Sequence, residues 1–427
     1  MEGAAAMETM EKMQYHFGVC MRAYFDYRQK RISAANFGAD NFVYNRMVAL
    51  NNERYQLKKV KIYCEPVARR LDYINTVLSS VREFQNAAAF SNGKDIDSLC
   101  IANARKHYSA AWEQHKKGLG SVPVFHKKTD SRSYQTNAHY FQKDDGHGNT
   151  IDRSNVYFTD KNHVMLPKLG RVRVKGSDAR LWQLFFQRHD VRIGTITISM
   201  DSIGRYSVSM QLGSMEPFVK LLPRTGSQRG YDVNLGNFYT DSDGNVEDIP
   251  KYRRHTQVKL AKAQRKLSLM GERAKREHRD LSASKNYQKQ RKKVAYIRTK
   301  AMLQNDNFQH VLSKREVESQ DFLFTEKLQV KSMLRNHKVS YAITDASWSG
   351  FFTKLSYKSK MYGKTYVQVP AKNTTQTCST CGYVSSGDNK IEWGVTEWTC
   401  PHCGTHHLRD HNAAVNILHR GQASTGT

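Results

Sequence analysis

Hydrophobic and polar residues alternate with a period of two near the start of the chain. Apolar side chains occupy six alternate positions there: Tyr15, Phe17, Val19, Met21, Ala23 and Phe25. This alternation is typical of a strand with one buried face. Helical spacing follows from residue 34 to about residue 57, and further helices are predicted over 65–84 and 98–116, the last capped at Asp97 and Ser98. The pattern over residues 34–117 therefore predicts a helical bundle inserted after a first strand. An independent helical domain would show the same pattern.

From residue 118 onward the apolar runs become short and alternating, separated by Gly, Pro and Ser. Strands are predicted over five ranges: 155–159, 163–166, 171–175, 195–200 and 205–212. Asp201-Ser202-Ile203-Gly204 between the last two is a hairpin signature. We expect a small β-barrel or curled sheet, to which the strand near Tyr15 also belongs.

A third kind of pattern begins at Gly230. Asp232 lies in a predicted strand that turns back at Asp241-Ser242-Asp243-Gly244, and an apolar strand over 321–328 carries Glu326 near its end. One helix is predicted from about residue 336 to 362, and a strand over 366–369 ends at Pro370. Between these strands, residues 251–300 predict two long helices with a break near Gly271.

The charge of the chain points to a polyanionic partner. Among 427 residues, 67 Lys and Arg stand against 39 Asp and Glu, a net charge of +28. Residues 251–300 alone contain 18 basic residues and three acids. An exposed helix face normally mixes both signs, so this excess predicts contacts with phosphates and salt-dependent binding.

Four of the seven cysteines form two Cys-x-x-Cys pairs, Cys378 with Cys381 and Cys400 with Cys403, and each pair is followed by a glycine. This spacing suits one structural Zn²⁺ held by four thiolates on two tight turns, which Trp393 and Trp398 would cover. Two disulfides or four free thiols are the alternatives. The remaining cysteines are expected to be reduced thiols: Cys20, Cys64 and Cys100.

The amino-terminal residues contain acids and no long apolar run, unlike a signal peptide, and no window is apolar enough to span a membrane. We therefore expect a soluble intracellular protein; the family resemblance described next implies the prokaryotic cytoplasm or nucleoid.

Six residues after the last cysteine, Arg409-Asp410-His411-Asn412-Ala413-Ala414 leads into a helical run. By itself, Asp410 is most simply a helix N-cap. However, the order CxxCG, CxxCG and RDxNAAxNIL at the carboxyl end of a basic chain resembles the transposon-encoded RNA-guided nucleases called TnpB. It equally resembles their relatives, the miniature type V CRISPR effectors of type V-F.

The resemblance implies a multidomain α+β fold with a RuvC-like, RNase H-fold nuclease domain. The implied divisions are a wedge β-barrel over 1–33 and 118–227, a helical recognition domain over 34–117, a nuclease domain over 228–375 and 406–427, and an inserted zinc ribbon over 376–405.

The resemblance also implies three catalytic carboxylates, Asp232, Glu326 and Asp410, which would together hold two Mg²⁺ ions. Gly230-Tyr231-Asp232 and Ser242-Asp243-Gly244 match the family's first motif, but Asn234 stands where many members have Gly. A shifted register would place Asn234 at the catalytic position and give an inactive protein. Arg409 would either steady the scissile phosphate or form a structural ion pair.

The implied activity is RNA-guided DNA cleavage by a monomer or homodimer on one guide RNA, with target DNA as the substrate. Two other functions stay open. One is an RNA-guided DNA-binding protein that has lost cleavage, and the other is a DNA transposase, because an RNase H-like carboxylate triad also performs strand transfer.

Overall fold

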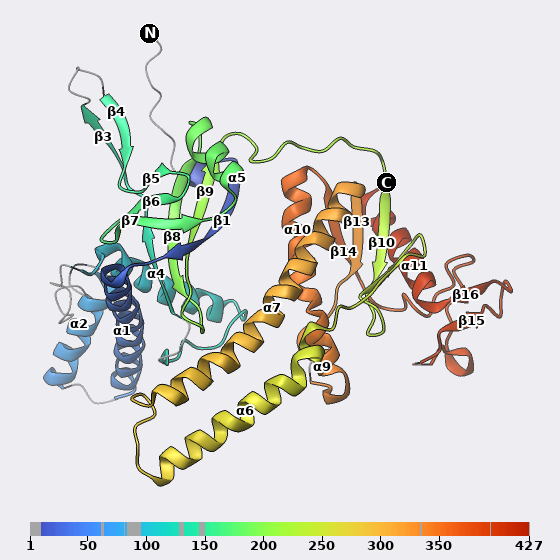
Figure 1. The fold of residues 1–427 in the computed structure, drawn as a ribbon. Coiled ribbons are helices and arrows are strands. Elements are labelled where there is room, and N and C mark those ends of the chain that lie inside the picture. Colours follow the sequence, from blue (N-terminus) through green and yellow to red (C-terminus); the bar gives the residue numbers. More distant parts are fainter. Residues whose placement is uncertain are drawn as a thin grey trace. The chain divides into compact units, whose positions relative to one another are not determined.

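The chain divides into two units, Met1–Phe218 and Val219–Thr427, which are described separately (Figure 1). The computed structural model describes residues 10–60, 64–80, 82, 95–127, 132–144, 150–333, 335–392 and 394–426. The division falls before the predicted boundary at 227. The residues between the division and this predicted boundary belong to the second unit, because Asp321 accepts hydrogen bonds from the backbone N–H groups of Thr225 and Gly226.

A seven-stranded antiparallel sheet forms the centre of the first unit. Its order is β2 (Arg132–Asn137), β8 (Arg192–Met200), β9 (Tyr206–Ser214), β1 (Tyr15–Tyr24), β7 (Gly170–Lys175), β6 (His163–Leu166) and β5 (Tyr157–Asp160). The predicted alternation in β1 is confirmed, since Val19, Met21 and Ala23 are buried. The predicted hairpin joins β8 to β9. The pairings among the described residues leave β2 and β5 as edges, so the sheet does not close into a barrel there.

Shorter elements complete this unit. They are a 3-10 turn at Met10–Lys12, a separate hairpin of β3 (Tyr140–Asp144) and β4 (Thr150–Ser154), and α5 (Asp178–Trp182) followed by a π-helical turn at Gln183–Gln187.

The described residues that follow β1 form α1 (Tyr27–Lys58), α2 (Glu65–Ser79) and α4 (Ser98–Lys116). The predicted start of the first helix at residue 34 is wrong, because Asp26 and Gln29 form a capping box at distances of 2.7 and 3.1 Å. The apolar alternation that ends at Phe25 hid this signal. Asp97 caps α4 as predicted, accepting from Leu99 N at 3.0 Å. Most of the predicted helix beyond Ser79 lies outside the described residues.

The second unit contains a five-stranded mixed sheet in the order β12 (Val246–Glu247), β11 (Tyr239–Asp241), β10 (Gln228–Asp232), β13 (Phe322–Glu326) and β14 (Thr365–Val369). Strands β10, β13 and β14 are parallel, whereas β11 and β12 are antiparallel. Parallel neighbours require long crossovers. The crossover between β10 and β13 contains α6 (Tyr252–Arg276) and α7 (Lys285–Ser319), which run side by side in Figure 1.

Two predicted helix boundaries in this unit are wrong. The break between the long helices falls at 277–284 and not near Gly271, because Ser284 caps α7 through Tyr287 N. The predicted helix over 336–362 is interrupted between α9 (His337–Ala346) and α10 (Trp348–Tyr362) by Ser347, whose φ is +54°. Gln309 stabilises this break by donating to the carbonyls of Ala346 and Ser347 at 2.9 and 3.0 Å.

The remaining elements are α8 (Val330–Met333), a 3-10 turn at Gly387–Asn389, the hairpin of β15 (Glu397–Thr399) and β16 (His406–Leu408), and α11 (Arg409–Thr425). No helix in the described part of the chain is long and apolar enough to cross a membrane.

The last helix packs unusually close to the sheet. A Cβ added to Gly230 in β10 would lie 2.3 Å from the carbonyl oxygen of Ala414, and one added to Gly421 would lie 2.2 Å from the ring of Phe324 in β13. His411 reaches the carbonyl of Ser242, after β11, at 3.1 Å. Helix α11 therefore crosses three strands with its backbone against β10.

Because α11 packs directly on Gly230, we expect a methyl group added at this position to destabilise the second unit. Gly230→Ala should lower the melting temperature of the second unit, because the backbone of α11 must move away, and overpacking of this kind costs ~1–3 kcal/mol. Gly18→Ala, in β1, is the matched control, since nothing lies within 4 Å of its added Cβ. Thermal unfolding of both variants checks the expectation, and equal melting temperatures would contradict it.

Candidate active site

Strand register places two of the predicted carboxylates side by side. In the parallel pair β10–β13, Gly230 aligns with Phe324 and Tyr231 with Thr325. The next residues along both strands are Asp232 and Glu326, at the carboxyl ends. Because side chains alternate between sheet faces, Asp232 shares the face of Gly230, on which α11 lies.

Helix α11 brings the third carboxylate to this face. Asp410 is in its first turn, one helical turn before Ala414, the residue that contacts Gly230. Residues four apart share a helix face, so Asp410 also faces the sheet. The N-cap is Leu408, so the simple interpretation of Asp410 as a helix cap is wrong. The contact of His411 with the Ser242 carbonyl anchors this end of the helix to the predicted turn.

The pKa of Asp232 responds to the charges of the other two groups. Burial raises the pKa of Asp232 well above its ordinary value, and the charges of Glu326 and Asp410 raise it further, against the opposing charge of Arg409. Burial also raises the pKa of Glu326, although a hydrogen bond from Thr374 opposes the shift. Crowded buried carboxylates disfavour their own ionised forms, so a bound cation would relieve the repulsion.

The donor set fits a hard divalent cation. Asp232 is 5 % exposed, and its carboxylate accepts no hydrogen bond from the described residues, so its oxygens are available as ligands. Carboxylate oxygens are the ligands that Mg²⁺ prefers, and Mg²⁺ usually keeps water or substrate oxygens as well. The prediction that Asp232, Glu326 and Asp410 hold Mg²⁺ is compatible with this donor set and stays a prediction.

Asn234 has a different role from Asp232. Its side-chain oxygen accepts from Asn237 N at 2.7 Å, and its amide lies 3.5 Å from Thr240 Oγ1. These contacts hold the turn between β10 and β11, beyond the end of the strand. The register with Asp232 beside Glu326 therefore has a structural reason, and Asn234 acts as a turn residue.

Arg409 forms no ion pair with Asp410 among the described residues. Its guanidinium donates to Val395 O at 3.4 Å, and its Nε is buried without a hydrogen-bond partner in the described part of the chain. This buried donor, on a guanidinium whose charge acts on Asp232, has capacity for an additional acceptor.

The four cysteines converge as predicted. All four sulfurs lie within 4.8 Å of one another, and the Cys378–Cys403 and Cys381–Cys400 sulfur distances are both 3.7 Å. Sulfurs at the corners of a tetrahedron with Zn–S bonds of ~2.3 Å would be ~3.8 Å apart. These distances favour a zinc site, since a disulfide bond is only ~2.05 Å long. The two turns are alike, with Gly382 at φ +76° and Gly404 at φ +71°.

The sequence analysis missed His407, which lies in β16. Its Nε2 is 3.1 Å from Cys378 Sγ, its side chain is buried, and its ring lies 5.0 Å from that of Trp398. An N–H donor beside a thiolate would stabilise its negative charge. No spacing rule marked His407, because the contact depends on the pairing of β15 with β16. Trp393 lies outside the described residues.

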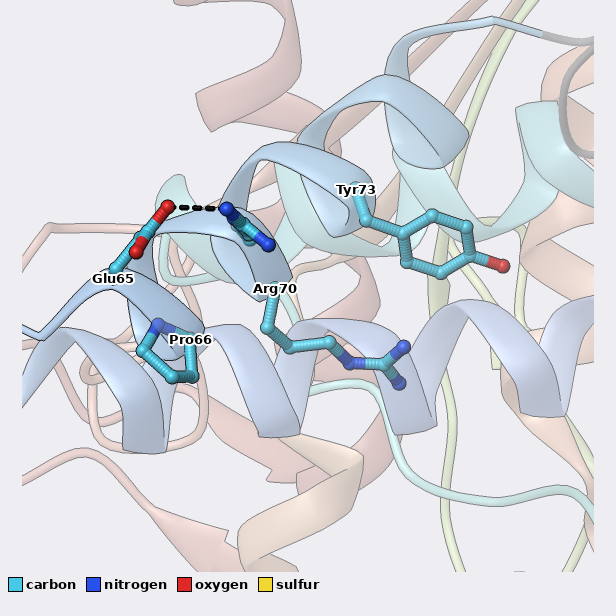
Figure 2. Close-up of a pocket in the computed structure, with 5 residues that line it drawn as sticks. Glu65, Pro66, Arg70 and Tyr73 are labelled. Carbon is cyan, nitrogen blue, oxygen red and sulfur yellow. Dashed lines mark hydrogen bonds and ion pairs between the residues drawn. The ribbon is translucent and has the colours of Figure 1, made fainter.

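A shallow hollow on α2 in the first unit offers no comparable chemistry (Figure 2). It has a volume of about 400 Å³, and its acid, Glu65, pairs with Arg69. Arg70 pairs with Glu53 of α1 at 2.6 Å and stacks over Tyr73. These charged groups connect two helices and are not arranged around a metal.

The raised pKa of Asp232 predicts that its carboxylate destabilises the metal-free protein. A folded-state pKa above the ordinary 3.8 means that stability is lost as the pH rises above that value. Asp232→Asn should therefore raise the melting temperature at pH 7 by ~2–4 °C, the effect of ~1 kcal/mol in a unit of this size. The difference in melting temperature between Asp232→Asn and the natural protein should become smaller toward pH 4, because Asp232 is then also uncharged in the natural protein.

Thermal unfolding without added Mg²⁺, and without chelators that would remove zinc, checks this expectation. Asp248→Asn, at an exposed position, is the control. A melting temperature of Asp232→Asn equal to or below that of the unmodified protein at pH 7 would show that the carboxylate is stabilised.

The cysteine geometry predicts about one zinc per chain. Cys381→Ser should lose the metal and make the region after residue 376 sensitive to proteolysis, because zinc binding and local folding are coupled. Cys20→Ser, an exposed cysteine outside the cluster, should retain both. Elemental analysis and limited proteolysis measure the two effects, and a folded, metal-free natural protein would refute the assignment.

Comparisons with known proteins identify two regions of the chain. Residues 348–417 match the family described as "Cas12f1-like, TNB domain", which spans α10, the zinc cluster and the start of α11. Residues 13–59 match HTH_OrfB_IS605, described as "Helix-turn-helix domain". In this structure those residues form strand β1 and helix α1.

Several relatives extend this similarity. A Streptomyces pristinaespiralis protein named "Putative RNA-guided DNA endonuclease" is 35 % identical over 232 residues, 54 % of each chain, so about half the length of that relative is matched. The Escherichia coli (strain K12) protein "Putative RNA-guided DNA endonuclease InsQ" is 24 % identical over 90 % of this chain and 87 % of its own. The "TnpB-like protein L79" of Acanthamoeba polyphaga mimivirus is 32 % identical over 117 residues, 26 % of this chain and 21 % of its own.

Two solved structures are loosely similar. "Cryo-EM structure of the Cas12f1-sgRNA-target DNA complex" matches 95 % of this chain and 98 % of its own, with a TM-score of 0.46 and 12 % identity. "Structure of the mini-RNA-guided endonuclease CRISPR-Cas_phi3" matches 95 % and 92 %, with a TM-score of 0.47 and 10 % identity. The sequence matches confirm the resemblance that the cysteine pairs and the Arg409-Asp410 helix indicated: one region of the chain matches the IS605 OrfB helix-turn-helix family, another matches the Cas12f1-like TNB family, and the chain is similar to proteins named RNA-guided DNA endonucleases and TnpB-like proteins.

Proposed function

We propose that this chain is an RNA-guided DNA endonuclease that cleaves target DNA through Asp232, Glu326 and Asp410 after a guide RNA pairs with one DNA strand. The observation that supports the proposal is that the charges of Glu326 and Asp410 both raise the pKa of the buried Asp232, as expected for three acids close together at one face of the sheet. The names of the relatives support the reaction class.

In this proposal the second unit is a RuvC-like nuclease domain with an inserted zinc ribbon over 376–405, and the first unit is a wedge domain carrying a helical recognition bundle. The parallel arrangement of β10, β13 and β14, with an antiparallel β11, supports the nuclease assignment. The zinc serves structure, since four cysteines leave it no open position for substrate.

The protein's own residues prepare the site for a phosphodiester. The three carboxylates would hold divalent cations, and the half-buried Arg409 would supply positive charge and an available Nε–H donor for the phosphate beside them. Two bound Mg²⁺ ions would activate the attacking water and neutralise the leaving oxygen. No histidine is required as a general base, and His411 is engaged with the Ser242 carbonyl.

The basic helices α6 and α7 support binding to RNA. Residues 251–300 carry 18 basic residues and three acids, one of which, Glu277, pairs with Arg273 and Arg279. The apolar contacts between the helices come from few residues, Ala263, Val294 and Ile297 among them. Most of the charge is therefore directed to other surfaces, where it would neutralise phosphates of a guide RNA.

Two alternatives to this function would use the carboxylate site differently. An RNA-guided binding protein without cleavage would require Asn234 to occupy the catalytic register, whereas Asn234 holds the turn after β10. A DNA transposase would use the same acids for strand transfer without a guide. Dependence on RNA distinguishes the transposase from the proposed function.

The test is a cleavage assay with Mg²⁺ and co-purified or transcribed guide RNA. Cleavage should follow the guide when its ~20 pairing nucleotides are changed, provided that the same flanking DNA motif is present. Asp232→Ala, Glu326→Ala and Asp410→Ala should each reduce cleavage by at least ~100-fold while RNA binding, measured separately, stays nearly unchanged. Asn234→Ala should be much milder.

Equal cutting of one DNA with a matched guide, a changed guide and no guide would overturn the proposal in favour of a transposase. Guide-dependent DNA binding without cleavage by the natural protein would favour the inactive binding protein instead. Full activity of all three carboxylate variants would refute the assigned site.

A further inference from the structure

The segment between β14 and the first cysteine pair lies along α11 and is bound by a row of polar side chains. Asn412, Asn416 and Arg420 are spaced by four residues and so share one face of α11. Asn412 accepts from Ser379 N at 2.9 Å and donates to Thr377 O at 2.8 Å. The end of the segment that reaches the first cysteine turn is thus attached to α11.

The other two side chains complete this row. Asn416 donates to Thr374 O at 2.9 Å and to Thr377 O at 2.6 Å. Arg420 donates to Pro370 O at 2.9 Å and to Lys372 O at 2.6 Å. Five hydrogen-bonded backbone groups between residues 370 and 379 therefore have their positions set by α11, the helix that also carries Asp410.

Thr374 lies in the middle of this segment, and its hydroxyl donates to Glu326 Oε1. Thr374 is 2 % exposed and Glu326 is 8 % exposed, so water does not readily replace this hydrogen bond. The Ala371 carbonyl, at 3.3 Å, is the alternative acceptor for the same hydroxyl. A hydroxyl has one hydrogen to donate, and the carboxylate is the stronger acceptor.

We propose that Thr374 is a positioning residue for metal binding: its hydroxyl fixes the orientation of the Glu326 carboxylate, and Asn416 fixes Thr374. This inference rests on the proposed function and adds a residue outside the three acids. A glutamate has three side-chain torsions, and β13 determines only where its Cα lies. The Thr374 hydrogen bond supplies the remaining constraint on the carboxylate.

This arrangement connects the zinc cluster to the carboxylate site. Thr374 is four residues before Cys378, in the segment that ends at the first cysteine turn, and its side chain reaches Glu326. One helix, α11, orders both ends of this connection: it carries Asp410 directly, and it places Glu326 indirectly through Asn416 and Thr374. Two of the three carboxylates therefore depend on the same helix.

The experiment uses zinc-loaded full-length protein and Mn²⁺ as a probe that replaces Mg²⁺. Free Mn²⁺ is measured by electron paramagnetic resonance, and the site is defined as the Mn²⁺ binding that Asp232→Ala abolishes. Thr374→Val, which keeps the shape and removes the hydroxyl, should weaken binding at this site by about 10-fold or more, the usual effect of losing a ligand-orienting partner. The Mg²⁺ concentration for half-maximal cleavage should rise by a similar factor.

Two matched variants test the hydroxyl itself. Thr374→Ser retains it and should restore wild-type Mn²⁺ affinity. Thr377→Val removes a hydroxyl from the same segment that donates to Asn373 O at 2.7 Å and not to Glu326, so its affinity should equal that of the natural protein. Thr374→Ala replaces Thr374→Val if the valine variant does not fold.

Wild-type Mn²⁺ affinity in a folded Thr374→Val or Thr374→Ala protein would overturn the inference alone. An equal loss of affinity in Thr377→Val would also overturn it, since the effect would then be general to the segment. A natural protein without an Asp232-dependent Mn²⁺ site would overturn the inference and the proposed function together.

Discussion

The second unit depends on the contact between the backbone of α11 and strand β10 at Gly230. Any Cβ at this position would lie 2.3 Å from the Ala414 carbonyl oxygen, so α11 can approach β10 this closely only where the strand has glycine. Gly421 of α11 likewise leaves space for the ring of Phe324 in β13, which an added Cβ would overlap. The close approach brings Asp410 to the face of the sheet that holds Asp232, and it brings the polar row of α11 to the segment before the cysteines.

Buried acids on the two faces of this sheet have opposite surroundings: one is hydrogen-bonded by donors, and the other lies near further acids. Glu316 of α7 is 2 % exposed and accepts hydrogen bonds from the hydroxyls of Tyr231 and Tyr239, both at 2.8 Å, and from Arg315 at 3.0 Å. It is a fully paired structural group. On the α11 face, Asp232 instead has acids as neighbours, and its pKa is raised. Buried charge without partners is costly, and such groups concentrate at functional sites.

The zinc cluster and the carboxylates are separate in chemistry but joined in structure. The thiolates would hold a closed metal site, whereas a divalent cation on the acids would keep ligand positions for water or other oxygens. The segment over 370–379 connects them, because α11 holds its backbone and Thr374 touches Glu326. The four-cysteine module is thereby connected to the carboxylate cluster, although none of its cysteines lies in that cluster.

Residue type and spacing alone predicted the strands carrying Asp232 and Glu326, the four-cysteine group and the β8–β9 hairpin, because these signals are local. Helix boundaries were less accurate: the capping box at Asp26 overlapped the apolar alternation, and the break at Ser347 depends on Gln309 from another helix. The roles of Asn234, His407 and Thr374 appeared only in the tertiary structure. Their partners are set by strand register and by how closely α11 approaches the sheet, and neither is encoded in the spacing of neighbouring residues.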